Sequence, residues 1–184
     1  MADDGYRRHE FWLSNGWAHI RETGWDAPGY WDLRDGEWTT FTLSGRRPVV
    51  PDEPVMHVSF YEADAFARWA GARLPTEFEW ERAATGAASV PGGPNPTGIG
   101  GARGQLLDPA RCHPGRAGAA MIGDVWEWTS SAYLPYPGFA PANGAVGEYN
   151  GKFMCDQHVL RGASAITPPG HERVSYRNFF PAES

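Results

Sequence analysis

Two stretches in the first half of the chain carry apolar residues at helical spacing, and each begins at a capping pattern. In both, a Ser or Thr is followed three residues later by Glu, so that the two side chains can satisfy the free amides of a first helical turn. The pattern predicts two short amphipathic helices, one from Ser59 to Gly71 and one from Thr76 to Gly86.

Alternating apolar and polar residues predict short strands elsewhere. Asp35 and Gly36 lie between two aromatic stretches, and because Gly tolerates the positive φ of a tight turn, we expect a hairpin there. We expect three further strands, at residues 125–129, 159–164 and 174–180. Two long loops rich in Gly and Pro are expected at residues 86–118 and 134–148.

The composition favours an irregular fold over a helix bundle. The 184 residues include 9 Trp, 23 Gly and 16 Pro, so large rings are packed by a chain that turns often. Hydrophobic residues make up 41% and charged residues 21%, as is typical of globular proteins. We therefore expect a single α+β domain over residues 1–184, with two short helices, short antiparallel strands and long ordered loops.

Charge and apolar runs exclude some partners. The net charge is −6 and no basic run could follow a phosphate backbone, so nucleic acid is not an expected partner. No segment has the apolar length of a signal peptide core or a membrane span, so we expect no membrane partner and a cytoplasmic protein. Cys112 and Cys155 are too few for a disulfide framework and are expected to be free thiols.

Four longer segments carry a more specific signal: Pro54–Ala63, Arg73–Glu81, Gly123–Trp128 and Leu160–Ser164. In this order they resemble the signature of the formylglycine-generating-enzyme-like superfamily, also called sulfatase-modifying factors. The resemblance implies a C-type-lectin-like domain with little regular structure, in agreement with the composition.

Four other segments are more specific still: Trp12–Trp17, Thr129–Phe139, Glu148–Met154 and Tyr176–Pro181. Within the superfamily, they are similar to the sulfoxide synthases of ergothioneine biosynthesis, and with them the resemblance covers nearly the whole chain. Those enzymes are oxidoreductases that use non-haem Fe(II) and O2 to join a thiol, cysteine or γ-glutamylcysteine, to the imidazole of hercynine as a sulfoxide.

In that family the iron is held by three histidines of an N-terminal DinB-like helical bundle. The six histidines of this chain include no i, i+4 pair on a predicted helix, so we expect no metal-binding residues here. Family members also continue past the Tyr176–Pro181 segment into a final strand. We therefore expect a domain truncated at both ends, or one that works with a bundle in cis or in trans; whether it is an enzyme alone stays open.

The resemblance also implies which residues face the substrates. By position it assigns Asn178, Phe179 and Phe180 to the imidazole-substrate pocket, where an amide can bond the imidazole and rings can hold a trimethylammonium group. The alternative is a strand end packed in the core. Some members carry an acidic residue at the Phe180 position, so the choice of thiol stays open. Tyr149 is a candidate catalytic proton donor, against an ordinary loop tyrosine.

Other conspicuous residues have structural interpretations. Asp124 could bind Ca2+, as in related domains, but a single Asp is more often a turn residue, and we prefer the turn. Trp80, Trp126 and Trp128 are predicted to be core scaffold, because their motifs are shared by superfamily members with unlike chemistry. The Glu residues between positions 77 and 81 are interpreted as the solvated charges of a helix.

Three other functions remain open. The copper formylglycine-generating enzyme needs two closely spaced cysteines after the Leu160–Ser164 motif, and residues 163–180 contain none, which disfavours it. A non-catalytic lectin-like binding module would explain the lack of iron ligands without a second domain. The third is a truncated remnant without function.

Overall fold

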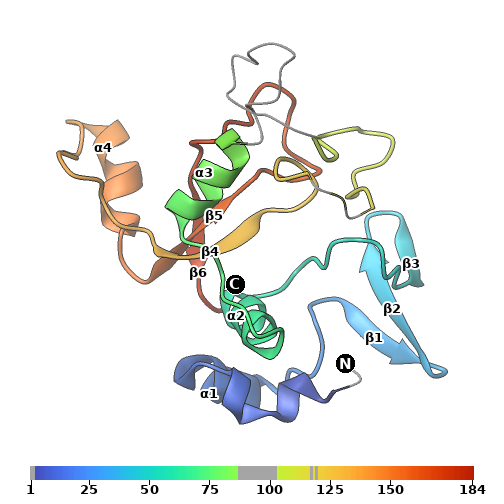
Figure 1. Ribbon diagram of the computed structural model, residues 1–184. Coiled ribbons are helices and arrows are strands. Elements are labelled where there is room, and N and C mark those ends of the chain that lie inside the picture. Colours follow the sequence, from blue (N-terminus) through green and yellow to red (C-terminus); the bar gives the residue numbers. More distant parts are fainter. Residues whose placement is uncertain (1–2, 87–102, 117, 119) are drawn as a thin grey trace.

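A computed structural model of the protein describes residues 3–86, 103–116, 118 and 120–184. This part of the chain contains two three-stranded antiparallel sheets and four α-helices, joined by loops (Figure 1). The α-helices are α1 (Ser14–Thr23), α2 (Phe60–Trp69), α3 (Glu77–Gly86) and α4 (Ala145–Asn150). The strands are β1 (Trp31–Arg34), β2 (Glu37–Thr42), β3 (Gly45–Pro48), β4 (Glu127–Ala132), β5 (Gln157–Arg161) and β6 (Asn178–Pro181). Short 3-10 helices lie at Gly5–Arg7, His9–Phe11 and Gly151–Phe153. The α+β class with short antiparallel strands is confirmed.

The predicted hairpin is confirmed in detail. β1 and β2 pair in antiparallel register with Arg34 opposite Glu37, and both residues between them have positive φ, 49° at Asp35 and 83° at Gly36. Such a turn matches the right-handed twist of its strands. β3, which the pattern did not predict, adds to the other edge of β2.

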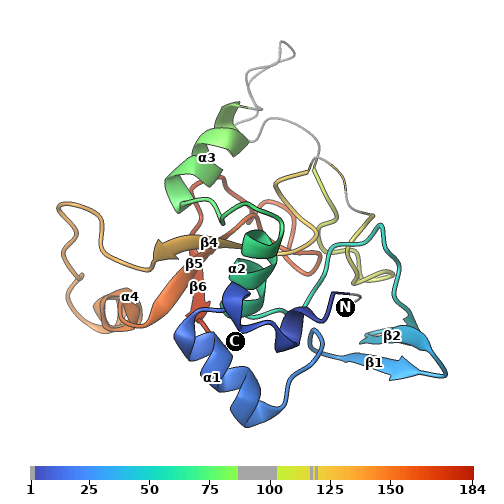
Figure 2. The same cartoon turned by 60° about the horizontal axis from the view of Figure 1, so that its bottom comes forward.

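The second sheet, in the order β4-β5-β6, is the centre of the domain. α3 packs against β4 and β5, and α2 packs against β4. Figures 1 and 2 show the sheet with α3 at one end and α2 at the other, while α1 runs beside α2. β6 is therefore an edge strand, with one side of its backbone turned away from β5.

Both predicted capping boxes are present. Ser59 and Glu62 bond each other's backbone amides at the start of α2, at 3.2 and 2.7 Å. Thr76 and Glu79 do the same before α3, at 3.2 and 2.8 Å. These local bonds fix where each helix begins.

Three apolar clusters form the core. Trp80 and Trp128 are buried within two of them, and Trp126 packs partly buried against the second, so the predicted packing of these residues in the core is confirmed. The buried members of the clusters are Trp80, Ala84, Ile122 and Val174; Phe60, Trp128, Leu160 and Ala182; and Trp12, Ile20 and Ala65.

Two helices were not predicted. α1 follows Leu13, which gives no side-chain cap, so the local signal of a helix start is missing. Its position is set by packing, because Gly16 approaches Tyr61 so closely that an added Cβ would lie 2.7 Å from the Tyr61 Cβ. α4 begins at Ala145, so the last four residues of the loop predicted over 134–148 are helical.

The later strands are shorter or shifted relative to the predictions. β5 ends at Arg161 because Gly162 and Ala163 take positive φ, 104° and 69°. β6 begins only at Asn178, because the carbonyls of Val174 and Tyr176 accept hydrogen bonds from the Arg161 guanidinium in place of a strand partner. β4 lies at 127–132, two residues later than its predicted start.

The loop predicted at 86–118 is described only in part. Residues 87–102 and 117 lie outside the described residues. Over 103–116 the chain has no helix or strand, and its one bridge pairs Arg103 with Ile122.

Two further expectations concern the cysteines and membrane-spanning helices. Cys112 and Cys155 are both free thiols, as predicted. In the described part of the chain, no helix has the length and apolar character needed to cross a membrane.

Candidate functional site

One cavity of about 590 Å³ is lined by all four residues that the sequence singled out. Asn178, Phe179 and Phe180 reach it from β6, and Tyr149 reaches it from α4. We call it the tyrosine cavity. Tyr149 and the β6 residues are far apart in sequence, so the fold brings them together, while their roles stay predictions. The other lining residues are Tyr133, Asn150, Phe153, Arg173, Ser175, Tyr176 and Arg177.

A chain of aromatic contacts forms the wall of the tyrosine cavity. The Phe179 ring stacks on Tyr133, with 4.1 Å between ring centroids and 11° between the planes. Phe153 lies 5.8 Å from Phe179 and 5.9 Å from Tyr149, centroid to centroid. Such a surface offers the negative faces of rings to a cationic group.

The polar groups of the predicted residues are free to bind a ligand. The Asn178 side-chain oxygen accepts the Phe179 amide at 3.0 Å, and its Nδ2 donates to no other described residue. Tyr149 is 66% exposed, and its hydroxyl has no hydrogen-bond partner within the described residues. Phe180 is 45% exposed and so is not a core residue.

Tyr133 links the sheet to α4. Its hydroxyl donates to the Asn150 side-chain oxygen at 3.2 Å, and burial raises the pKa of the phenol, so it stays a protonated donor at neutral pH. Because Asn150 directly follows Tyr149 at the end of α4, this bond helps to hold Tyr149 over the cavity.

A buried ion-pair network lies behind the aromatic wall. Glu77 accepts both Nε and Nη2 of Arg177, at 2.8 and 2.9 Å, and Nη2 of Arg161, at 2.9 Å. The side chains of Glu77 and Arg161 are 3% and 0% exposed. The interpretation of Glu77 as a solvated charge was therefore wrong, since its partners Arg161 and Arg177 are 84 and 100 residues away and no local pattern reveals the pairing.

The same network contacts the cavity rings directly. The Arg177 guanidinium carbon lies 4.6 Å from the Tyr133 ring centroid and 4.3 Å from that of Tyr136. Tyr136 also donates its hydroxyl to Glu77 at 2.9 Å. Glu77 thus holds Arg177 against the ring on which Phe179 stacks.

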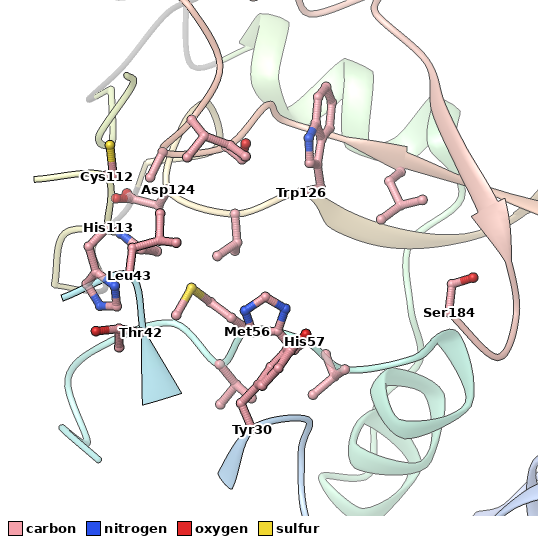
Figure 3. Close-up of a pocket in the computed structure, with 18 of the residues that line it drawn as sticks. Tyr30, Thr42, Leu43, Met56, His57, Cys112, His113, Asp124, Trp126 and Ser184 are labelled. Carbon is pink, nitrogen blue, oxygen red and sulfur yellow. The ribbon is translucent and has the colours of Figure 1, made fainter. Parts of the chain in front are cut away.

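A second cavity, of about 600 Å³, adjoins the first at Phe180, which lines both. We call it the apolar cavity. Figure 3 shows Met56, His57 and Trp126 around it, with Cys112 near one end and Ser184 near the other. Its wall is mostly apolar, and the side chains of His57, Cys112, His113 and Asp124 also line it.

Asp124, at the edge of the apolar cavity, is a turn residue as preferred from the sequence. Its φ is 59°, and its Oδ1 accepts the backbone amides of Gln105 and Gly115 at 3.0 and 2.6 Å. The carboxylate is therefore used to join three loop segments. The possibility that it also binds Ca2+ stays a prediction.

The histidines are spread over the molecule and have separate surroundings. Among the described residues, no three His, Cys, Asp or Glu side chains are grouped so that they could hold a metal ion. The six histidines contact Trp17 (His9), Trp25 (His19), Tyr30 (His57), Glu53 (His113), Phe60 (His158) and Tyr176 (His171).

Comparison with known proteins gives the family. Residues 2–98 match the family described as "Sulfatase-modifying factor enzyme 1-like domain", which is more than half of the chain. The chain belongs to this family. The superfamily resemblance inferred from the motifs is thereby confirmed.

Similarity to curated relatives of this family extends further. The chain is 42% identical to the hercynine oxygenases of Mycolicibacterium smegmatis and Mycobacterium tuberculosis, over 97% of this chain and 45% of each relative. It is 32% identical to the formylglycine-generating enzyme of Streptomyces coelicolor, over 82% of this chain and 50% of that one. The chain thus spans half or less of the length of these relatives.

A solved structure shares the fold of this sulfatase-modifying-factor-like domain. PvdO from Pseudomonas aeruginosa matches 91% of this chain, and 70% of its own chain is covered, with a TM-score of 0.55 at 21% identity. At this level of identity the likeness supports the fold alone.

The sequence reasoning missed several residues of the tyrosine cavity. Tyr133, Phe153, Arg173 and Arg177 line it but were not singled out. Tyr133 lies in the segment Thr129–Phe139 and Phe153 in the segment Glu148–Met154. The resemblance of these segments to the sulfoxide synthases was the available signal. Nothing in the local sequence distinguishes Arg173 from a surface arginine.

His158 supports the β6 side of this site from behind. It lies opposite Phe180 in the β5–β6 ladder and stacks on Phe60, with 3.7 Å between ring centroids. Burial lowers the pKa of its imidazole below the usual 6.5, against the opposite influence of Asp64. Its Nδ1 is buried and has no hydrogen-bond partner among the described residues.

We expect this histidine to make stability depend on pH. The unfolded chain binds the proton more readily than the folded one, so its contribution is complete above pH 6.5 and is lost as pH falls from there through the lower folded pKa. Urea unfolding at about pH 7.5 and about pH 5.5 measures it. His158→Phe should have a weaker pH dependence, whereas His9→Phe, on an exposed ring, should match the parent. An unchanged dependence in His158→Phe contradicts the prediction.

Proposed function

We propose that this domain forms one wall of the active site of a sulfoxide synthase, and that hercynine binds in the tyrosine cavity for coupling to cysteine or γ-glutamylcysteine with O2. The observation that carries the proposal is the meeting of Asn178, Phe179, Phe180 and Tyr149 around one cavity. The 42% identity to hercynine oxygenases over 97% of the chain also supports it.

Each residue has a role that its surroundings permit. The free Nδ2 of Asn178 donates to an imidazole nitrogen of the substrate. Phe179 and Phe180 pack the trimethylammonium group, which has no N–H to donate and is attracted by ring faces. The exposed Tyr149 hydroxyl gives a proton near the reacting centre.

Phe180 bears on the choice of thiol. No Asp or Glu lines the tyrosine cavity among the described residues, so the ammonium group of the thiol substrate has no carboxylate partner on this wall. A partner for that ammonium would have to come from another part of the enzyme. Both thiols therefore remain candidates.

The described residues do not fit an iron site, because no three potential ligands are grouped. We propose that a DinB-like helical bundle, in cis or in trans, carries the Fe(II). When bound there, Fe(II) supplies the activation of O2. This domain then binds and orients the substrate and moves a proton at the Tyr149 hydroxyl.

The rival functions make different demands on this chain. A copper formylglycine-generating enzyme needs a pair of thiolates, but Cys112 lies in the wall of the apolar cavity and Cys155 is exposed beside Asp156. A binding module needs only the tyrosine cavity. It predicts ligand binding without turnover.

The test is oxygen consumption by the purified chain with Fe(II), hercynine and either thiol, with and without a DinB-like bundle from a related enzyme. We expect turnover only with the bundle. Asn178→Ala should lower this turnover, while Asn143→Ala, at an exposed loop position, should not. Turnover without the bundle would refute the proposal that the iron ligands lie outside this domain. Hercynine binding without turnover, both with and without the bundle, would favour the binding module.

A further inference from the structure

We propose that Arg173 binds the substrate carboxylate in the tyrosine cavity, so that this wall selects a trimethylammonium amino acid, a betaine, over its decarboxylated analogue. The inference rests on the proposed function and adds a specificity-determining residue to it. It follows from the different surroundings of the two arginines that line the cavity, Arg173 and Arg177.

Arg177 is already neutralised. Two of its nitrogens bond the Glu77 carboxylate, at 2.8 and 2.9 Å, and Nη1 donates to the Leu134 carbonyl at 3.1 Å. Its side chain is only 13% exposed. Because its Nε and Nη2 groups already donate to one carboxylate, the Arg177 guanidinium cannot bind a second carboxylate through the same two groups.

Arg173 is in the opposite state. It is exposed, its side chain has no hydrogen bond or ion pair among the described residues, and its guanidinium carbon lies 5.5 Å from the Tyr176 ring centroid. No acidic residue among the described ones pairs with it, and none lines the cavity. Its positive charge and its guanidinium N–H groups are therefore available to a ligand.

The turn before β6 places this charge at the cavity. The Tyr176 amide donates to the Arg173 carbonyl at 3.0 Å, which closes a turn two residues before Asn178. The buried Arg161 holds the same turn by donating to the carbonyls of Val174 and Tyr176, at 2.8 and 3.3 Å. The position of Arg173 relative to Asn178 is thus fixed by buried bonds, although its side chain is exposed.

These features match one class of ligand. A betaine carries a quaternary ammonium, which aromatic rings bind without a carboxylate, and a carboxylate, which a guanidinium binds through two parallel hydrogen bonds. The tyrosine cavity offers rings, an unpaired arginine and no acid. Hercynine has both groups, and its imidazole would reach the Asn178 amide.

The experiment is calorimetric titration of the full chain with two probes, hercynine and its decarboxylated analogue, the trimethylammonium derivative of histamine. We expect the parent chain to bind hercynine roughly tenfold more tightly than the analogue. Arg173→Gln should lose this preference by weakening hercynine alone. Arg82→Gln, which changes an exposed arginine on α3, is the matched control and should keep it.

The outcomes separate the two proposals. Equal affinity of the parent chain for both probes, or an unchanged preference in Arg173→Gln, overturns the assignment of Arg173 while hercynine binding itself stands. Failure of the parent chain to bind either probe contradicts the proposed function and this inference with it. Urea unfolding of Arg173→Gln shows whether the variant is folded, which the exposure of the side chain leads us to expect.

Discussion

Replacement of Glu77 by alanine is expected to lower the free energy of unfolding by about 3–5 kcal/mol. The change leaves Arg161, which is 0% exposed, and Arg177 without the carboxylate that both share. Arg161 then keeps only the partly exposed Glu81 carboxylate, and Arg177 keeps no carboxylate among the described residues, so two largely buried guanidinium groups lose most of their charge compensation. Equilibrium unfolding in urea, followed by tryptophan fluorescence, measures the loss.

The matched control is Glu81→Ala. Glu81 also accepts Nη2 of Arg161, at 2.9 Å, but its side chain is 38% exposed and Arg161 keeps its bond to Glu77. We therefore expect a loss of at most about 1 kcal/mol, as for partly exposed ion pairs. Similar losses in the two variants would show that burial of the Glu77 pair is not what stabilises the fold.

The second large effect is expected on ligand binding. Phe179→Leu keeps an apolar side chain, although a smaller one, and removes the ring that stacks on Tyr133 at 4.1 Å. Loss of a desolvated cation–π contact costs up to about 2 kcal/mol, so calorimetry should show hercynine binding weakened by up to roughly 30-fold. Phe66→Leu, at an exposed ring on α2 that lines neither cavity, should bind normally.

A second ligand isolates the cause. Imidazolepropionate keeps the ring and the carboxylate of hercynine but has no trimethylammonium group. If Phe179 acts through its ring face, Phe179→Leu should leave the affinity for imidazolepropionate nearly unchanged. Equal weakening of both ligands would mean that the substitution distorts the cavity, and unchanged hercynine binding would remove Phe179 from the site.

The four candidate site residues lie around one cavity, while their roles stay predictions. Asn178, Phe179, Phe180 and Tyr149 were taken from a resemblance, and the fold gathers them around one cavity. The resemblance could transfer positions because motifs keep their order along the chain. It could not supply Tyr133, whose importance lies in contacts with residues 17 and 46 positions away.

Glu77 shows most clearly why the rest escaped prediction. From its neighbours it is an acidic residue in the first turn of a helix, where water would be the expected environment. Its actual partners, Arg161 and Arg177, are 84 and 100 residues away along the chain. A pairing of that kind leaves no periodicity to detect, since neither partner lies on the same element as Glu77.

What the sequence determined by itself is local. The Asp35–Gly36 hairpin and the capping boxes at Ser59 and Thr76 depend on bonds within about four residues, so the residue types alone specify them. Tertiary structure decided which charges are buried, where the uncapped α1 packs, and that Tyr149 and Arg173 share a cavity with β6. These outcomes depend on burial and long-range contact, which exist only once the chain has folded.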